Sequence, residues 1–240
     1  MLSTLAGSTT IVYIVGNFNA LLTSYGILYS SIFKVSPILV LYLVLGSMGD
    51  VPKVLILGHS FIKRLKADIA RGLHPRMSLT FSLFGTADIL MHGVGGRKID
   101  SLRSCDLHVV QKVMPDIVLL EIGTNDLMTA APEVVGSALD DLVTLLRTQY
   151  SVKVVGVCLV IPRGTSSQRF SYFWNKAKIY NNYVKVVLDS CPGVFCWRHK
   201  AFTRPGIRFY DRHGVHLNTK GQYLLYRSYR GAILHALHML

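Results

Sequence analysis

Short apolar runs alternate with longer amphipathic stretches along the chain after residue 50. Runs rich in aliphatic and β-branched residues, bounded by glycine, proline and polar turns, predict buried strands. They lie at residues 54–57, 78–84, 117–122, 152–161 and 194–197. Apolar residues at intervals of three and four, with charges between them, predict helices. These lie at residues 60–73, 132–150, 168–188 and 219–240.

Strands that alternate with helices predict an α/β domain with a doubly wound, parallel, five-stranded sheet. In such a sheet, ligands bind beyond the carboxyl ends of the strands. We expect residues 58–60, 93–97 and 123–126 there, together with the loop before the last helix. Nearly all the polar residues that suggest chemistry fall in these four segments.

The first fifty residues have a different pattern. No charged residue occurs before Lys34, and residues 11–33 are long enough to span a bilayer as a helix, although small polar residues interrupt them. A second apolar run, residues 37–45, is too short to span alone. Three interpretations stay open: a membrane anchor (a transmembrane helix), a signal-type segment, or an upstream extension. We expect residues 1–50 to be separate from an α/β domain at residues 51–240.

The basic residues after this segment indicate on which side of a membrane the domain would lie. If the segment spans a membrane, the positive-inside tendency favours a membrane-anchored protein with a cytoplasmic domain. A soluble cytoplasmic protein is the alternative, and four cysteines without a CxxC pair agree weakly with a reducing compartment. The cysteines also lack zinc-finger spacing, so the sequence predicts no metal site.

The chain has a formal net charge of +13, most of it in the last third. Residues 151–240 hold 14 of the 26 basic residues but only 2 of the 13 acidic ones. Such a surface attracts nucleic acid, an anionic membrane surface or an acidic partner, while a solvated basic face with no dedicated partner is the alternative. Interleaved aromatic residues, which can stack on the bases of a single strand, make nucleic acid a possible partner. They are Phe170, Tyr172, Phe173, Trp174 and Tyr180.

Ser60 follows the first strand and stands at the predicted start of a helix. A helix amino terminus offers free N–H groups and a positive potential, which favour an alkoxide and then an oxyanion. Taken alone, however, Ser60 fits an N-cap residue better. Gly96 and Asn125, after the next two strands, supply N–H donors suited to an oxyanion hole. His216, just before the last helix, could reach over the sheet edge to Ser60 as a base.

These residues fall within four blocks that occur in order along the chain. The blocks are GHS at 58–60, VGG at 94–96, GTND at 123–126 and HGVH at 213–216. Their order and strand context resemble the SGNH (GDSL-type) hydrolases, whose blocks are G-D-S, a glycine after the second strand, G-x-N-D and D-x-x-H. The resemblance covers about residues 51–240.

The resemblance implies a flavodoxin-like sheet and hydrolysis of acyl esters without a metal or an organic cofactor. It implies that Ser60 is the nucleophile and His216 the base. The oxyanion donors it implies are the Ser60 N–H, the Gly96 N–H and the Asn125 amide.

Two positions depart from the family pattern. His59 stands where the family has aspartate beside the nucleophile, which is tolerable because that residue is not the nucleophile. His213 stands where the family has the triad acid, which orients the imidazole and stabilises its charged form. Asp211 is a possible substitute acid, although it could equally be a turn residue or a partner of a nearby arginine. A serine–histidine pair assisted by a backbone carbonyl is the other alternative.

The run GHSFIKRL at 58–65 and the following GTNDL also look like SGNH-type domains in some animal retrotransposon-derived proteins, a looser likeness. Such proteins act near nucleic acid, which agrees with the basic last third. Two functions are therefore expected. One is an esterase acting on a small ester substrate. The other is a catalytically weakened SGNH-like domain that binds at nucleic acid or a membrane surface.

Overall fold

The computed structural model describes residues 51–163, 168–188, 190–202 and 207–240. The expected anchor or extension at residues 1–50 lies outside the described residues. Among the residues that are described, no helix is both long and apolar enough to cross a membrane.

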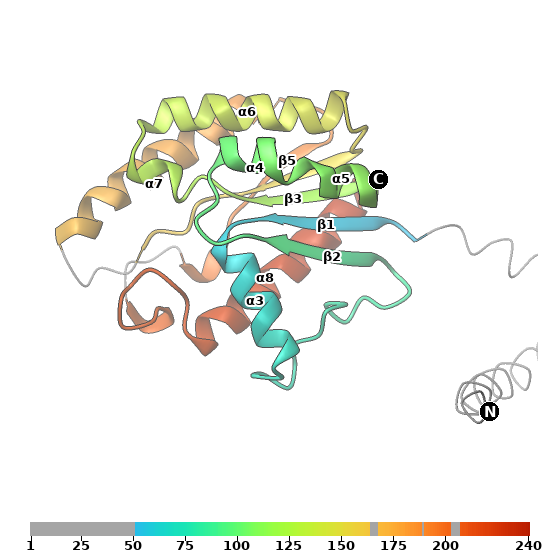
Figure 1. Cartoon of the computed structure of the whole chain (residues 1–240), viewed down its shortest axis with the longest axis horizontal. Helices are drawn as coiled ribbons and strands as arrows, with labels where there is room; N and C mark the ends of the chain where they lie inside the picture. The colour runs from blue at the N-terminus through green and yellow to red at the C-terminus, as the bar shows by residue number, and fades with distance from the viewer. Residues whose placement is uncertain (1–50, 164–167, 189, 203–206) are drawn as a thin grey trace, which may run out of the picture. The chain divides into compact units, whose positions relative to one another are not determined.

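Five parallel strands form one sheet in the order β2-β1-β3-β4-β5 (Figure 1). The strands are β1 Lys53–Gly58, β2 Asp88–Gly93, β3 Ile117–Glu121, β4 Val154–Cys158 and β5 Val194–Trp197. This is the flavodoxin-like order, in which the chain reverses its direction of winding between β1 and β3. The α/β class and the five-stranded parallel sheet predicted from the sequence are therefore confirmed.

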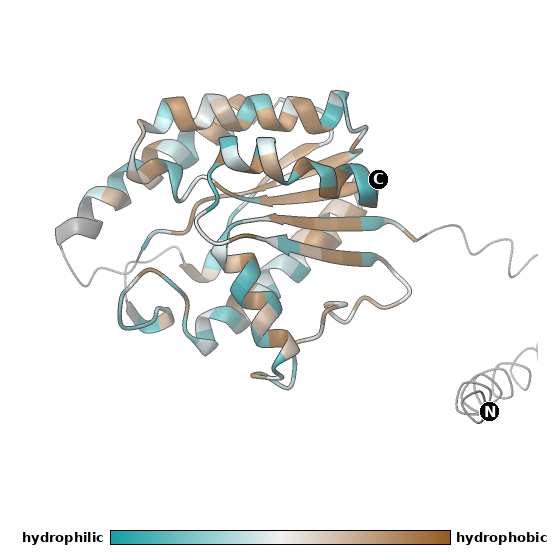
Figure 2. Cartoon of the chain, in the orientation of Figure 1, coloured by the Kyte–Doolittle hydropathy of each residue, from teal (hydrophilic) through white to brown (hydrophobic). Residues whose placement is uncertain are grey.

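Helices cover both faces of the sheet (Figure 1). On one face lie α3 Ser60–Ala70 and α8 Thr219–Leu237. On the other lie α4 Ile99–Cys105, α5 Leu107–Val113, α6 Pro132–Thr148 and α7 Gln168–Leu188. Figure 2 shows that the strands are hydrophobic along most of their length, whereas hydrophilic residues occur throughout the helices. This is the polarity expected of a sheet enclosed between two helical layers.

Alternate side chains of each strand enter opposite layers of the core. In β1, Val54 and Ile56 belong to the core layer of α3 and α8, whereas Leu55 and Leu57 belong to the opposite layer. All four side chains are fully buried. Because both faces need apolar residues, the strand is apolar at consecutive positions and not only at every second one.

The second strand does not lie where the sequence pattern predicted it. Residues 78–84 form turns, and Phe81 and Ser82 have positive φ angles of 52° and 54°, which an extended strand does not allow. An apolar residue occurs at position 81 because Phe81 is buried and its ring stacks on that of Tyr226 of α8, with ring centroids 4.6 Å apart. The true strand, β2, is an edge strand with Asp88 and Leu90 exposed, so its sequence lacks a continuous apolar run.

The helices α4 and α5, which connect β2 to β3, have no counterpart among the predicted elements. Each has only seven residues, which is too short for a helical period to be distinct. The other predicted helices and strands are present, with ends that differ by a few residues at most. Three short 3-10 turns complete the described elements, namely η1 Asp126–Met128, η2 Lys200–Phe202 and η3 Ile207–Phe209.

Candidate active site

Ser60 is the first residue of α3 and follows β1 through a very tight turn. A Cβ atom built on Gly58 would lie 2.1 Å from the carbonyl oxygen of Glu121 on β3, so only glycine fits there. The same oxygen accepts a hydrogen bond from the His59 N–H at 3.2 Å. These contacts hold Ser60 at the carboxyl edge of the sheet, between β1 and β3.

His59, and not Ser60, caps the amino terminus of α3. Its Nδ1 accepts a hydrogen bond from the Phe61 N–H at 3.3 Å. The expectation that Ser60 sits at the N-cap is therefore wrong, because the preceding imidazole serves the free N–H. Among the described residues, the Ser60 hydroxyl makes no hydrogen bond. Helix capping thus does not explain this serine.

A cavity of about 530 Å³ opens at this edge of the sheet. Four residues predicted for the site line it: Ser60 from α3, Gly96 from the loop after β2, Asn125 from the loop after β3, and His216 from the loop before α8. The other lining residues are His59, Phe61, Lys63, Arg64, Ala67, Gly95, Thr124, Arg163 and Val215. The parallel sheet brings these side chains together because its strands all end at one edge.

The loops that carry Gly96 and Asn125 hold each other in place. Gly96 has a φ of +73°, in the left-handed region that favours glycine. The Asn125 side-chain amide donates to the Arg97 carbonyl oxygen at 2.9 Å. Asp126 Oδ1 accepts from the N–H of Ile99, the first residue of α4, at 3.0 Å. The GTND segment is therefore tied to the glycine loop by two hydrogen bonds.

A buried carboxylate supports this arrangement from behind. Arg97 donates to Asp106 through Nε at 2.6 Å and through Nη2 at 2.8 Å, a bidentate contact. His92 Nε2 lies 3.3 Å from the same carboxylate, which is almost fully buried. Burial would raise the pKa of Asp106, but the hydrogen bonds from Arg97 and His92 outweigh burial and lower it. Since Asn125 bonds to the Arg97 carbonyl, Asp106 helps to position Asn125.

His216 lies on a short loop that backbone contacts fix before α8. The Asp211 N–H donates to the His216 carbonyl oxygen at 2.7 Å, and Tyr210 pairs with Leu217 in an antiparallel bridge. The Nδ1 atom of His216 is buried and has no hydrogen-bond partner among the described residues. Burial lowers the pKa of His216, and the charge of Arg64 lowers it further. The ring is therefore mostly neutral near pH 7.

Among the described residues, neither Asp211 nor His213, the residue at the family's acid position, is hydrogen-bonded to this ring. Asp211 Oδ1 accepts from the His213 N–H at 3.0 Å, so its carboxylate closes the turn. His213 is exposed, and its Nε2 accepts from Arg212 Nε at 3.1 Å. In the described part of the chain, no hydrogen bond joins the side chain of either residue to the His216 ring, and none joins that ring to Ser60. The fold brings Ser60 and His216 to one cavity, and Asp211 does not line it.

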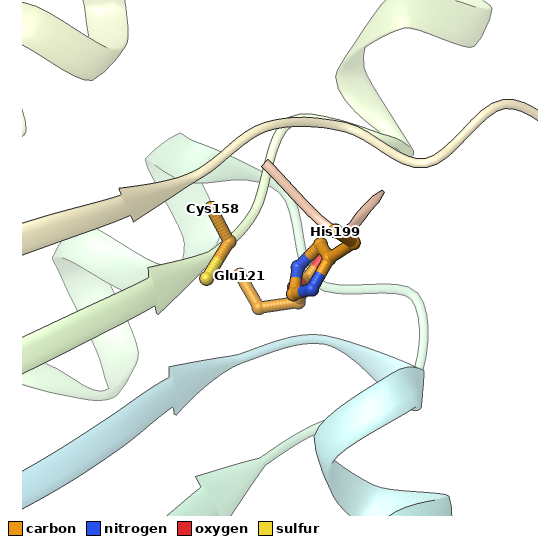
Figure 3. Close-up of side chains that lie close together, drawn as sticks. All are labelled: Glu121, Cys158 and His199. Carbon is orange, nitrogen blue, oxygen red and sulfur yellow. The ribbon is translucent and has the colours of Figure 1, made fainter. Parts of the chain in front are cut away.

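A second carboxylate lies buried at the carboxyl end of β3. Glu121 is fully buried, and its Oε2 accepts from Tyr229 Oη at 2.8 Å and lies 3.0 Å from His199 Nε2. His199 Nδ1 lies 2.8 Å from Ser228 Oγ on α8. Figure 3 shows Glu121 and His199 beside Cys158, the last residue of β4. Sequence reasoning missed this cluster; its signal is a single glutamate at the end of an otherwise apolar strand.

Glu121 also connects the cluster to the residue beside Ser60. Its Oε1 is 3.9 Å from His59 Nε2, and that nitrogen is 3.2 Å from Thr124 Oγ1. Burial lowers the pKa of His59 to about 4, although Glu121 acts in the opposite direction. Burial would raise the pKa of Glu121, but His199, His59 and Tyr229 together lower it. At neutral pH, a neutral His59 therefore lies next to an ionised Glu121.

Glu121, Cys158 and His199 have donor atoms within 4.8 Å of one another and are the described residues best placed to hold a metal ion. Burial and the charge of Glu121 raise the pKa of the Cys158 thiol well above its ordinary value. Metals bind the thiolate, so a metal ion at this cluster would have to displace the Cys158 proton against the raised pKa.

A flavodoxin-like sheet with a serine, a histidine, a glycine and an asparagine around one cavity defines the SGNH class of hydrolases. The family model described as the GDSL-like lipase/acylhydrolase family matches residues 57–224. The chain belongs to this family, and the family predicted from the four sequence blocks is therefore confirmed. No curated protein sequence matches the chain.

Several solved structures share the fold at low sequence identity. A mutant acetyl esterase with an acetate ion has 16% identity and a TM-score of 0.59, over 78% of this chain and 98% of its own. A carbohydrate esterase of family 3 from Talaromyces cellulolyticus has 16% identity and a TM-score of 0.60, over 79% and 99%. A GDSL-like lipase from Bacteroides thetaiotaomicron has 14% identity and a TM-score of 0.61, over 81% and 96%.

Proposed function

We propose that this protein hydrolyses carboxylic esters of small substrates, with Ser60 as nucleophile and His216 as base. The observation that carries the proposal is the single cavity lined by Ser60, Gly96, Asn125 and His216. Membership of an ester-hydrolase family and the fold shared with esterases of known structure support the same activity.

The chemistry follows from the roles of these four residues. His216 removes the hydroxyl proton as Ser60 Oγ attacks the carbonyl carbon of the ester. The N–H groups of Ser60 and Gly96 and the amide of Asn125 stabilise the oxyanion of the tetrahedral intermediate. His216 then gives its proton to the departing alcohol, which leaves an acyl group on Ser60. Water, activated by the same imidazole, releases the acid and restores the serine.

Catalysis in this site relies on a base to which no described carboxylate is hydrogen-bonded. The lowered pKa of His216 keeps the ring neutral and able to accept a proton near pH 7. It also makes the ring a weaker base, because among the described residues no carboxylate is hydrogen-bonded to the ring, and the charge of Asp211 only partly offsets burial and the nearby cations. We therefore infer a slow esterase, with a serine–histidine pair in place of a full triad.

A binding function is the second candidate, and the unpartnered Nδ1 of His216 favours it. A domain whose catalytic histidine has no acid to orient it would keep the cavity but hydrolyse esters only slowly. The basic last third would then supply the affinity for nucleic acid or an anionic membrane surface. Two of the aromatic residues first considered for base stacking, Phe173 and Tyr180, are buried in the core, whereas Tyr172 is exposed.

The substitution Ser60→Ala separates the two candidates. We expect hydrolysis of p-nitrophenyl acetate to fall to the background rate, with an unchanged circular dichroism spectrum. Labelling by a fluorophosphonate should disappear in the same variant. The matched control is Ser104→Ala, an exposed serine on α4 outside the cavity, which should retain both signals. Equal turnover in Ser60→Ala and the parent protein would end the assignment of Ser60 as nucleophile, and no turnover in either would favour the binding function.

A further inference from the structure

The helix that begins with the candidate nucleophile presents two cations to the same cavity. Ser60, Lys63, Arg64 and Ala67 all line it. Their spacing of three, four and seven residues places them on one face of α3. The residues on its other side are buried, namely Phe61, Ile62, Leu65, Asp68 and Ile69. The fold therefore places Lys63 and Arg64 of α3 beside the cavity in which a substrate would bind.

Lys63 and Arg64 have no acidic partner in the described structure. Both side chains are exposed, and neither forms an ion pair. Arg163, from the segment after β4, adds a third cation to the cavity wall. Its position is fixed locally, because its carbonyl oxygen accepts from Trp174 Nε1 at 3.2 Å and its guanidinium lies 5.0 Å from the centroid of the Phe173 ring.

No aspartate or glutamate is among the described residues that line the cavity. A cleft that carries one sign of charge raises the local concentration of ligands of the opposite sign. The amino terminus of α3 adds a partial positive charge at Ser60 itself. Lys63, Arg64 and the helix terminus at one cavity therefore select for a negative charge on the ligand, and an uncharged ester would leave Lys63 and Arg64 without an acidic partner.

We propose that the substrate is an ester that carries a negative charge close to its scissile bond, such as a carboxylate or phosphate on the acyl or the alcohol part. This inference rests on the proposed esterase function and names the substrate class of the same site. Lys63 and Arg64 lie three and four residues beyond Ser60, a rise of about 4.5–6 Å along the helix. The negative group is therefore separated from the scissile carbonyl by a chain of a few bonds.

The test uses two pairs of esters that differ by one charge and the parent protein, full length. The first pair is p-nitrophenyl hexanoate and the p-nitrophenyl monoester of adipic acid, with the charge on the acyl part. The second is phenyl acetate and 4-acetoxybenzoate, with the charge on the alcohol part. From two exposed charge pairs we expect a preference in kcat/KM of about tenfold for the anionic member of one pair, which also identifies the side that bears the charge.

The double variant Lys63→Gln/Arg64→Gln should lose this preference, so that the ratio within the pair falls toward one. Added salt should reduce the ratio in the parent protein, because exposed charges are screened. The control is Lys112→Gln on α5, which removes an exposed cation that does not line the cavity, and it should keep the parent ratio. Hydrolysis of all four esters without a preference for charge would overturn the substrate class and leave the esterase function intact.

A direct binding measurement keeps the inference testable if no ester is hydrolysed. Calorimetric titration with adipate should show binding to the parent protein that is weakened about tenfold in the double variant. Binding of adipate without any turnover would support the anion site and refute the esterase function. No binding of adipate to the parent protein, together with no turnover, would overturn both.

Discussion

Restoring a carboxylate at residue 213 is expected to accelerate ester hydrolysis. His216 Nδ1 is buried and has no hydrogen-bond partner among the described residues, while His213 is exposed and accepts a hydrogen bond from Arg212. The substitution His213→Asp introduces an acceptor at the position where SGNH hydrolases have their acid. Its charge would hold the Nδ1–H and stabilise the imidazolium as Ser60 is deprotonated.

The expected gain follows from the change in hydrogen bonding. A hydrogen bond to a charged group contributes about 1.5–3 kcal/mol, and each 1.36 kcal/mol changes a rate tenfold. The full effect would therefore be about 10-fold to 100-fold in kcat/KM. Arg212 Nε, 3.1 Å from the present His213 ring, would compete for the new carboxylate. We therefore expect a gain in kcat/KM at the lower end of this range, about tenfold.

The assay is hydrolysis of p-nitrophenyl acetate as a function of pH, with His213→Asn as the control of similar size and no charge. The new carboxylate raises the pKa of His216, so the acidic limb of the kcat/KM profile should move to higher pH. The gain should be complete at pH 8 and smaller near pH 6, where more of the ring is protonated. The asparagine variant should show neither change.

An unchanged rate in a folded His213→Asp variant would refute the reasoning that a missing acid limits catalysis. A loss of activity in Asp211→Asn would instead assign the acid role to Asp211. The structure argues against that outcome, because the Asp211 carboxylate is bonded to the His213 N–H.

Three further predictions concern pH and charge. Because the pKa of His59 is about 4 in the folded chain and about 6.5 when unfolded, the unfolded state takes up a proton first. The free energy of unfolding should therefore fall by about 3 kcal/mol as pH drops from above 6.5 to 4. Urea unfolding of the parent protein and of His59→Gln, each at pH 7.5 and pH 5, would show whether His59 causes this pH dependence. Arg64→Gln should raise the pKa of His216 and move the acidic limb of the kcat/KM profile to higher pH. Arg163 and His213 would still lower that pKa, and Asp211 would still raise it. An acidic limb at an unchanged pH would show that Arg64 does not act on the ring. If the basic region 151–240 binds single-stranded nucleic acid, a protein of residues 51–240 should shift the gel mobility of a labelled oligonucleotide at low salt, and this shift should disappear at moderate salt. No shift at low salt would refute nucleic-acid binding by this region.

Much of the candidate site could be read from the sequence because it depends on strand ends. Apolar runs show where the strands of a parallel sheet lie, and the residues that follow them must meet at one edge. Ser60 and Asn125 were placed in this way. Gly96 was placed after a second strand predicted at residues 78–84, where the structure has turns and puts the strand at Asp88–Gly93, and His216 was placed on the loop before the last helix. The structure brings all four residues to one cavity. The departure at His213 was also visible, since it depends only on residue identity within the HGVH block.

Long-range contacts decided the remainder. Whether Ser60 or His59 caps α3 depends on the direction of the His59 ring, which Thr124 and Glu121 set from β3 and the loop after it. The alternating pattern at residues 78–84 reflects packing of a loop on α8, which local periodicity cannot distinguish from a strand.

The sequence by itself determined the alternation of strands and helices, the family, and the residue types available at the sheet edge, because all of these depend on local pattern. It did not determine the position of β2 or the presence of α4 and α5. Only the tertiary structure decided which of those residues share a cavity, that His216 Nδ1 has no hydrogen-bond partner within the described part of the chain, and that Glu121 is buried with His199 and Tyr229. The reason is physical: burial, desolvation and hydrogen bonding arise between residues far apart in the chain, and their effects on charge and pKa exist only once the fold has formed.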